Sequence, residues 1–138
     1  MVQCVEEILT KLSQLALENQ EIVILWLYGS RANHTEHLES DYDLAIAFKT
    51  FLADPLEIRL RPEILALEWQ SELQLRENQL SIVDINQVSI SLACAVMQCD
   101  YVLFCRDHGR LWQEQRRIDS RMEIDVLYHI HREARIDE

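Results

Sequence analysis

The chain has 138 residues, of which 49% are hydrophobic, and its formal net charge is −11. These values predict one domain over residues 1–138 with a proper core; no apolar stretch approaches the roughly 20 residues that span a bilayer. The acidic balance argues against direct nucleic-acid binding, which needs basic patches. The N-terminal segment lacks a basic region followed by an apolar one, so we expect no signal peptide, and the four cysteines form no Cys-x-x-Cys pair. We therefore expect reduced thiols and a cytoplasmic protein.

The first two predicted elements are an amphipathic helix and a buried strand. Over Val2–Glu18, apolar residues recur at helical spacing, which predicts a helix that covers one face of a sheet. The apolar run Ile22–Tyr28 predicts the first strand and ends in Gly29-Ser30. Glycine permits a sharp turn and a close approach of the backbone to a ligand. Amides that follow it at the start of a short helix can receive a phosphate.

Two aspartates follow Ser30 after ten intervening residues. Asp41 and Asp43 lead into an apolar run that ends at Phe48, which predicts the second strand. Side chains two apart on a strand share a face, so the two carboxylates project together and repel each other unless a cation lies between them. Mg²⁺ is commonly held by one or two carboxylates plus substrate phosphates. The pattern predicts a nucleotide site, in which Arg31 either reaches a phosphate or pairs with an acid.

The rest of the chain is predicted to alternate helices and strands. In order, we expect a helix from Pro62 to about Glu77, a strand Leu80–Ile85, a helix Ile90–Gln98 with Ser89 as N-cap, a strand Tyr101–Cys105, a turn Arg106–Gly109 and a helix Leu111–Ala134. Asp84 lies inside the third strand, where a carboxylate is costly unless it is paired or bound to metal. The apolar stripe of the last helix fits packing on its own sheet or docking of a partner.

The motif Gly-Ser-x10-Asp-x-Asp resembles the signature of the minimal nucleotidyltransferases, small members of the DNA polymerase β-like superfamily. The order of predicted elements is similar over nearly the whole chain. The resemblance implies an α/β (α+β) fold, with helices packed on a small mixed sheet of about four strands. It also implies transfer of a nucleotidyl group from ATP with the help of two Mg²⁺ ions.

The resemblance assigns roles to five residues of this chain. Asp41 and Asp43 would bind both metal ions. Asp84 would bind the catalytic metal and help to deprotonate the incoming hydroxyl. The nucleotide phosphates would lie on Gly29 and Ser30. Arg31, which directly follows them, is a further candidate nucleotide contact because of its position.

In size and motif order the chain is similar to the antitoxin of HEPN/MNT toxin–antitoxin pairs. There, the partner is an all-helical HEPN ribonuclease, and the antitoxin is thought to silence it by attaching AMP to a tyrosine hydroxyl. An acidic antitoxin also suits a basic, RNA-cutting partner. We therefore expect an antitoxin that adenylylates its toxin. The alternatives are an antitoxin that neutralises by binding alone, with a vestigial nucleotide site, and an enzyme that modifies a small molecule such as an antibiotic.

Overall fold

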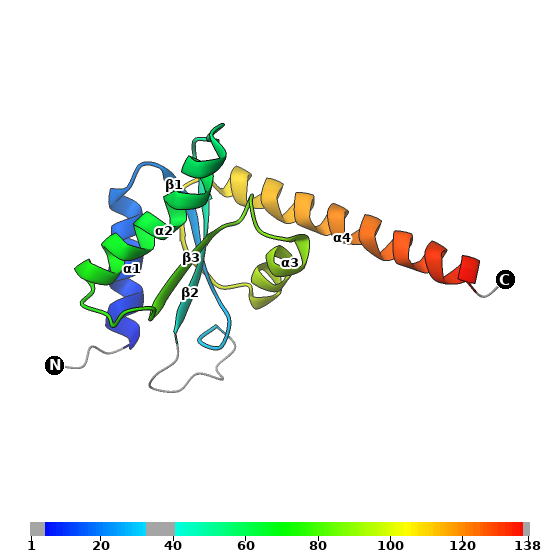
Figure 1. Cartoon of the computed structure of the whole chain (residues 1–138). Helices are drawn as coiled ribbons and strands as arrows, with labels where there is room; N and C mark the ends of the chain where they lie inside the picture. Colours follow the sequence, from blue (N-terminus) through cyan, green and yellow to red (C-terminus); the bar gives the residue numbers. More distant parts are fainter. Residues whose placement is uncertain (1–4, 33–40, 137–138) are drawn as a thin grey trace.

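The computed structural model describes residues 5–32 and 41–136 (Figure 1). Its elements are α1 (Val5–Glu18), β1 (Ile22–Tyr28), β2 (Tyr42–Phe48), α2 (Pro55–Glu72), β3 (Leu80–Asp84), α3 (Ile90–Cys99), β4 (Val102–Cys105) and α4 (His108–Ile136). The predicted α+β class with a four-stranded mixed sheet is confirmed. The short helix expected between the first two strands lies outside these residues. Within them, none of the helices has the length and apolar character needed to cross a bilayer.

The sheet has the strand order β3-β2-β1-β4. Strand β1 runs antiparallel to both β2 and β4, whereas β2 and β3 are parallel. The register places Tyr28 opposite Asp43, Asp43 opposite Ser81, and Ile46 opposite Asp84. The end of β1 and the start of β2 therefore lie side by side at one end of the sheet. Both halves of the predicted motif, Gly29-Ser30 and Asp41/Asp43, lie there.

Helices cover both faces of the sheet, with α1 and α2 on one side and α3 and α4 on the other (Figure 1). The alternation of side chains along β2 separates the two cores. Leu44 and Ile46 pack in the cluster that includes residues of α1 and α2, whereas Ala45 and Ala47 belong to the cluster that includes residues of α3 and α4. Asp43 shares the parity of the two alanines, so its side chain points to the α3–α4 face.

Helix α2 begins earlier than the sequence analysis predicted. Asp54 is its N-cap and accepts a hydrogen bond from the Leu56 amide, and Pro55 occupies the first helical turn. Proline suits that position because its missing N–H would have no helical partner there. Pro62, the predicted start, is buried inside the helix. The prediction was wrong because the helix begins at the first of the two prolines, Pro55, which directly follows the capping aspartate.

Helix α4 is also longer than predicted. It begins at His108, and the Asp107 carboxylate accepts hydrogen bonds from the amides of Gly109 and Arg110. Gly109 therefore lies in the first turn of the helix rather than in a preceding turn. Further along, the buried Glu114 forms ion pairs with Arg110 and Arg117, both at 2.9 Å, which helps to anchor this end of the helix.

Candidate functional site

The site is built around the contact between Gly29 and Asp43. Gly29 follows the last residue of β1 and has a φ of +76°, a region that side-chain-bearing residues rarely adopt. A Cβ at this position would lie 2.5 Å from Oδ2 of Asp43. The glycine therefore serves two needs at once, since it permits the turn and leaves space for the carboxylate against the backbone.

The second carboxylate, Asp41, lies directly before β2 and is exposed. The pKa of Asp43 is raised above its usual range, mainly by burial and to a smaller extent by the negative charge of Asp41. The pKa of the neighbouring Tyr28 is also raised, to about 12, mainly by burial and to a smaller extent by the charge of Asp43. Negative charge is thus disfavoured at Asp43, and a cation shared by the two aspartates would relieve that cost. The carboxylate pair fits an Mg²⁺ that is also held by substrate phosphates.

Ser30 and Arg31 continue the turn after Gly29. Arg31 is buried, and its guanidinium carbon lies 4.0 Å from the centre of the Tyr42 ring. A cation over an aromatic ring gains stabilisation from the ring's negative face. Arg31 is therefore held in place beside the motif, and contacts of Ser30 and Arg31 with a nucleotide remain predictions.

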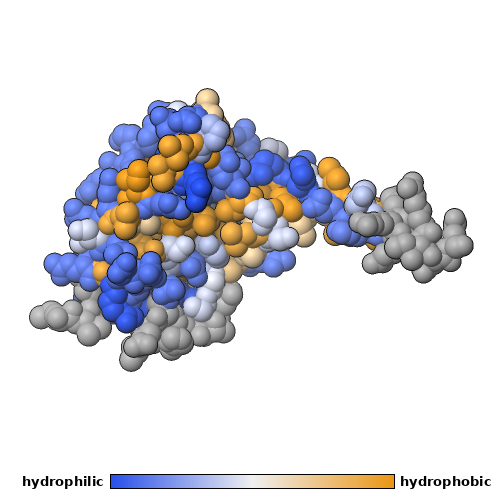
Figure 2. Space-filling view, in the orientation of Figure 1, coloured by the Kyte–Doolittle hydropathy of each residue, from blue (hydrophilic) through white to orange (hydrophobic). Residues whose placement is uncertain are grey.

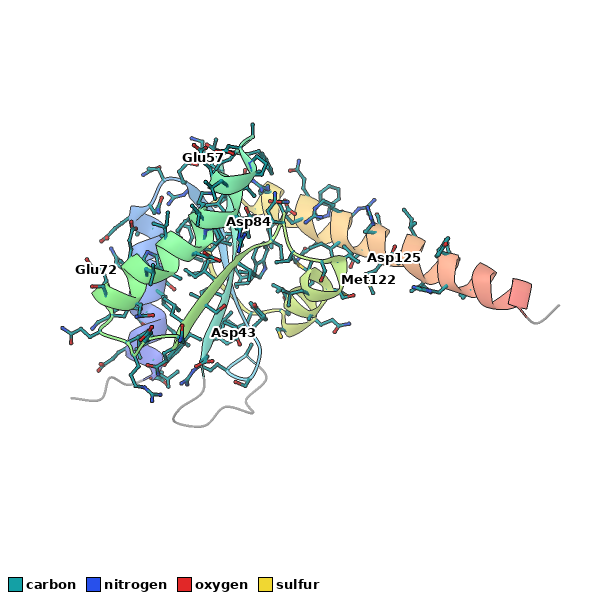
Figure 3. All side chains as sticks on the ribbon, in the orientation of Figure 1. Asp43, Glu57, Glu72, Asp84, Met122 and Asp125 are labelled. Carbon is teal, nitrogen blue, oxygen red and sulfur yellow. The ribbon has the colours of Figure 1, made fainter. Side chains whose placement is uncertain are left out.

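Asp84 does not join the other two carboxylates, which corrects the expectation from the sequence. It pairs with Ile46, three residues beyond Asp43 along β2, which is about 10 Å along a strand. The labelled side chains lie toward opposite ends of the sheet in Figure 3. Asp84 also points to the opposite face, where its Oδ2 lies 3.5 Å from Nη2 of Arg61 of α2, and its Oδ1 accepts a hydrogen bond from the Asn86 amide at 2.9 Å.

The physical reason for an aspartate at this position is a buried ion pair rather than proximity to Asp41 and Asp43. Asp84 is only 5% exposed, so its charge needs a partner. Arg61 supplies it, and is itself oriented by a hydrogen bond to the Thr50 carbonyl oxygen at 2.8 Å and by its position over the Phe48 ring. These contacts account for Asp84 as part of the fold.

Ser81 is the β3 residue that lies beside Asp43. The two are register partners in the parallel pair, and Ser81 is exposed; neighbouring strands are about 4.8 Å apart. Sequence reasoning missed Ser81 because it looked for a third acid, and only the register reveals which residue of β3 faces the pair. Over residues 5–32 and 41–136, no cluster of three or more acids, histidines or cysteines is arranged to hold a metal.

The close contact at Gly29 gives a direct test. Gly29→Ala should lower the free energy of unfolding by about 1–3 kcal/mol, because it places a side chain in a strained region and against Asp43. Gly109→Ala is the matched control: the nearest atom to its Cβ is Oδ1 of Asp107 at 3.1 Å, and alanine favours a helix by up to about 1 kcal/mol. Urea unfolding of wild type and both variants measures the difference. A Gly29→Ala variant that is as stable as Gly109→Ala would contradict the role of Gly29.

A second pair of variants separates the two aspartates. Asp84→Ala should lower the free energy of unfolding by about 3 kcal/mol, because it leaves Arg61 without its carboxylate. Asp43→Asn should be at least as stable as wild type at pH 7 without metal, because it removes a carboxylate whose pKa is raised by folding. That advantage should shrink as the pH falls through the pKa of Asp43, where the wild-type carboxyl becomes neutral. Urea unfolding across pH measures both, and the reverse ranking would contradict the assignments.

Residues 10–109 match the family model for polymerase β nucleotidyltransferases. No curated protein matches the chain. Among solved structures, a chain of a toxin–antitoxin complex with AMP-PNP has 20% identity and a TM-score of 0.62, with 97% of each chain covered.

Two further solved structures are similar over nearly the full length. One is the MntA–HepT toxin–antitoxin complex, at 18% identity and a TM-score of 0.64, with 96% of both chains covered. The other is a tri-AMPylated Shewanella oneidensis HEPN toxin in complex with an MNT antitoxin, also at 18% identity and a TM-score of 0.64, with 96% of this chain and 95% of that chain covered. At these identities the likeness is one of fold. The family match extends over most of the sequence, and the chain therefore belongs to the polymerase β nucleotidyltransferase family.

Proposed function

We propose that this chain is the antitoxin of a HEPN toxin–antitoxin pair and that it transfers AMP from Mg·ATP to a tyrosine hydroxyl of its toxin. The observation that carries the proposal is the juxtaposition of Gly29 with Asp43, beside a second carboxylate on Asp41. The similar chains in toxin–antitoxin complexes support the partner, and the AMPylated toxin in one of them supports the reaction.

Each residue of the site has a defined task in this proposal. Asp41 and Asp43 would hold the metal, and the turn at Gly29 and Ser30 would receive the phosphates. When bound, Mg²⁺ would supply positive charge that neutralises the phosphate oxygens, so that a protein with a net charge of −11 could bind ATP. The two carboxylates would orient the nucleotide at the end of the sheet where β1 ends and β2 begins, and where Asp41 is exposed.

The proposed transfer is a substitution at the α-phosphorus of ATP. The tyrosine oxygen forms a bond to that phosphorus, and the bond from the α-phosphorus to the oxygen bridging the α- and β-phosphates breaks. Pyrophosphate leaves with the electron pair, and the hydroxyl proton is released to solvent. Asp84 takes no part, because it lies on the other face of the sheet and is paired with Arg61.

The position of Asp84 favours a second candidate, an antitoxin that neutralises its toxin by binding alone. With two carboxylates rather than three beside Gly29, the site would bind Mg·ATP without transferring AMP. The two candidates make different predictions for the same experiment.

The intact mass of the toxin distinguishes them. After incubation with this chain, ATP and Mg²⁺, the toxin should gain one or more AMP units, and peptide mapping should place them on tyrosine. The double variant Asp41→Asn/Asp43→Asn should give no gain in mass while still forming the complex. If neither protein changes the mass and both inhibit the toxin equally, neutralisation by binding replaces the transferase proposal.

Ser81 offers a test that does not depend on catalysis. Ser81→Asp places a third carboxylate beside Asp43, so it should lower the melting temperature in metal-free buffer and enlarge the rise caused by Mg²⁺. Ser81→Asn changes the shape similarly without the charge and should show neither effect. Thermal unfolding with and without Mg²⁺ measures this, and an Mg²⁺ response of Ser81→Asp no larger than that of wild type would place the metal elsewhere.

A further inference from the structure

Helix α4 has 29 residues, which corresponds to roughly 43 Å at 1.5 Å per residue. Its first part is packed on the body of the protein, where Glu114 and Ile118 are buried. The rest extends well beyond α3 and the sheet (Figure 1), and Met122 and Asp125 mark the region where the helix leaves the body (Figure 3). About half of this helix therefore lacks a neighbour within the described chain.

The projecting part carries large apolar side chains in contact with solvent. Five of them are exposed by 50% or more: Ile124, Val126, Leu127, Tyr128 and Ile130. Orange patches interrupt the blue surface of this helix in Figure 2. By comparison, the apolar residues of α1 that pack on the sheet, such as Leu12, are fully buried.

These side chains point in several directions around the helix axis. Successive residues rotate by about 100°, so Val126 and Ile130 lie on one side, Ile124 and Tyr128 on the other, and Leu127 between them. A helix with apolar residues over most of its circumference is normally enclosed by other elements. One flat contact would leave part of this surface in water, so the pattern predicts insertion into a groove.

Acidic residues accompany the apolar ones. One face of the helix carries Met122, Val126 and Leu127 together with Asp119 and Glu123. Nearby, Arg121 pairs with Asp125 at 4.0 Å, whereas no ion pair of Asp119 or Glu123 occurs among the described residues. With a net charge of −11 for the chain, a second copy would bring like charges together, whereas a basic partner would complement them.

We propose that Met122–Ile130 is a docking helix that inserts into an apolar groove with a basic rim on the toxin. This proposal rests on the proposed function for the existence of that partner. Helix α4 covers the same face of the sheet to which Asp43 points. A toxin held by this helix would therefore lie on the side of the sheet to which Asp43 points.

Binding of the purified HEPN toxin to the full-length chain tests the docking helix. Leu127→Asp/Ile130→Asp should weaken toxin binding by at least 100-fold in calorimetry, because it places charges in the apolar contact. The control Leu17→Asp/Leu67→Asp makes the same change at residues of α1 and α2 that are 50% and 64% exposed, and should change the affinity by less than threefold. All proteins should bind Mg·ATP equally, which shows that the fold and the nucleotide site are intact.

The outcomes separate this inference from the proposed function. If Leu127→Asp/Ile130→Asp binds the toxin as tightly as wild type and the toxin still gains AMP, the docking helix is wrong and the transferase proposal stands. Weaker binding by this variant, with no AMP transfer by wild type, supports the docking helix and removes the transferase activity. Light scattering that shows a wild-type dimer, which the variant converts to a monomer without loss of toxin affinity, would assign the surface to a second copy and overturn the proposal.

Discussion

The candidate site depends on how closely the Asp43 carboxylate approaches the backbone of Gly29. A side chain at Gly29 would collide with that carboxylate, and the turn itself has a positive φ. Burial and the charge of Asp41 then raise the pKa of Asp43, so negative charge is unfavourable at Asp43, which has a second carboxylate beside it. A divalent cation with bound phosphates resolves that conflict. The antiparallel pairing of β1 with β2 fixes this contact, because β1 ends and β2 begins at the same end of the sheet.

The two aspartates that a motif search treats as equivalent have different physical roles. Asp43 is partly exposed and lies beside another acid, whereas Asp84 is buried and lies beside Arg61. The first arrangement is relieved by a bound cation; the second already has its counter-charge. Sheet register separates them, because a residue on β3 belongs to the site only if it faces Asp43, and Ser81 does so.

The sequence predicted the sheet and its helices well, since runs such as Ile22–Tyr28 have few other ways to bury their side chains. The sequence also predicted Ser89 as the N-cap of α3, and the structure confirms this. The errors came from choices that depend on context. The start of α2 was assigned to Pro62 although Asp54 and Pro55 carry the capping pattern. The role of Asp84 depended on pairing between strands far apart in sequence, which local pattern does not determine.

The most direct test of this account is a crystal structure of the chain with Mn²⁺ and AMP-PNP. The metal gives an anomalous signal that locates it without reference to the protein. The account predicts a peak within ligand distance of the Asp41 and Asp43 carboxylates, with phosphate oxygens on the Gly29-Ser30 turn and the Asp84–Arg61 pair unchanged. A metal bound to Asp84, or a nucleotide bound away from Gly29, would contradict it.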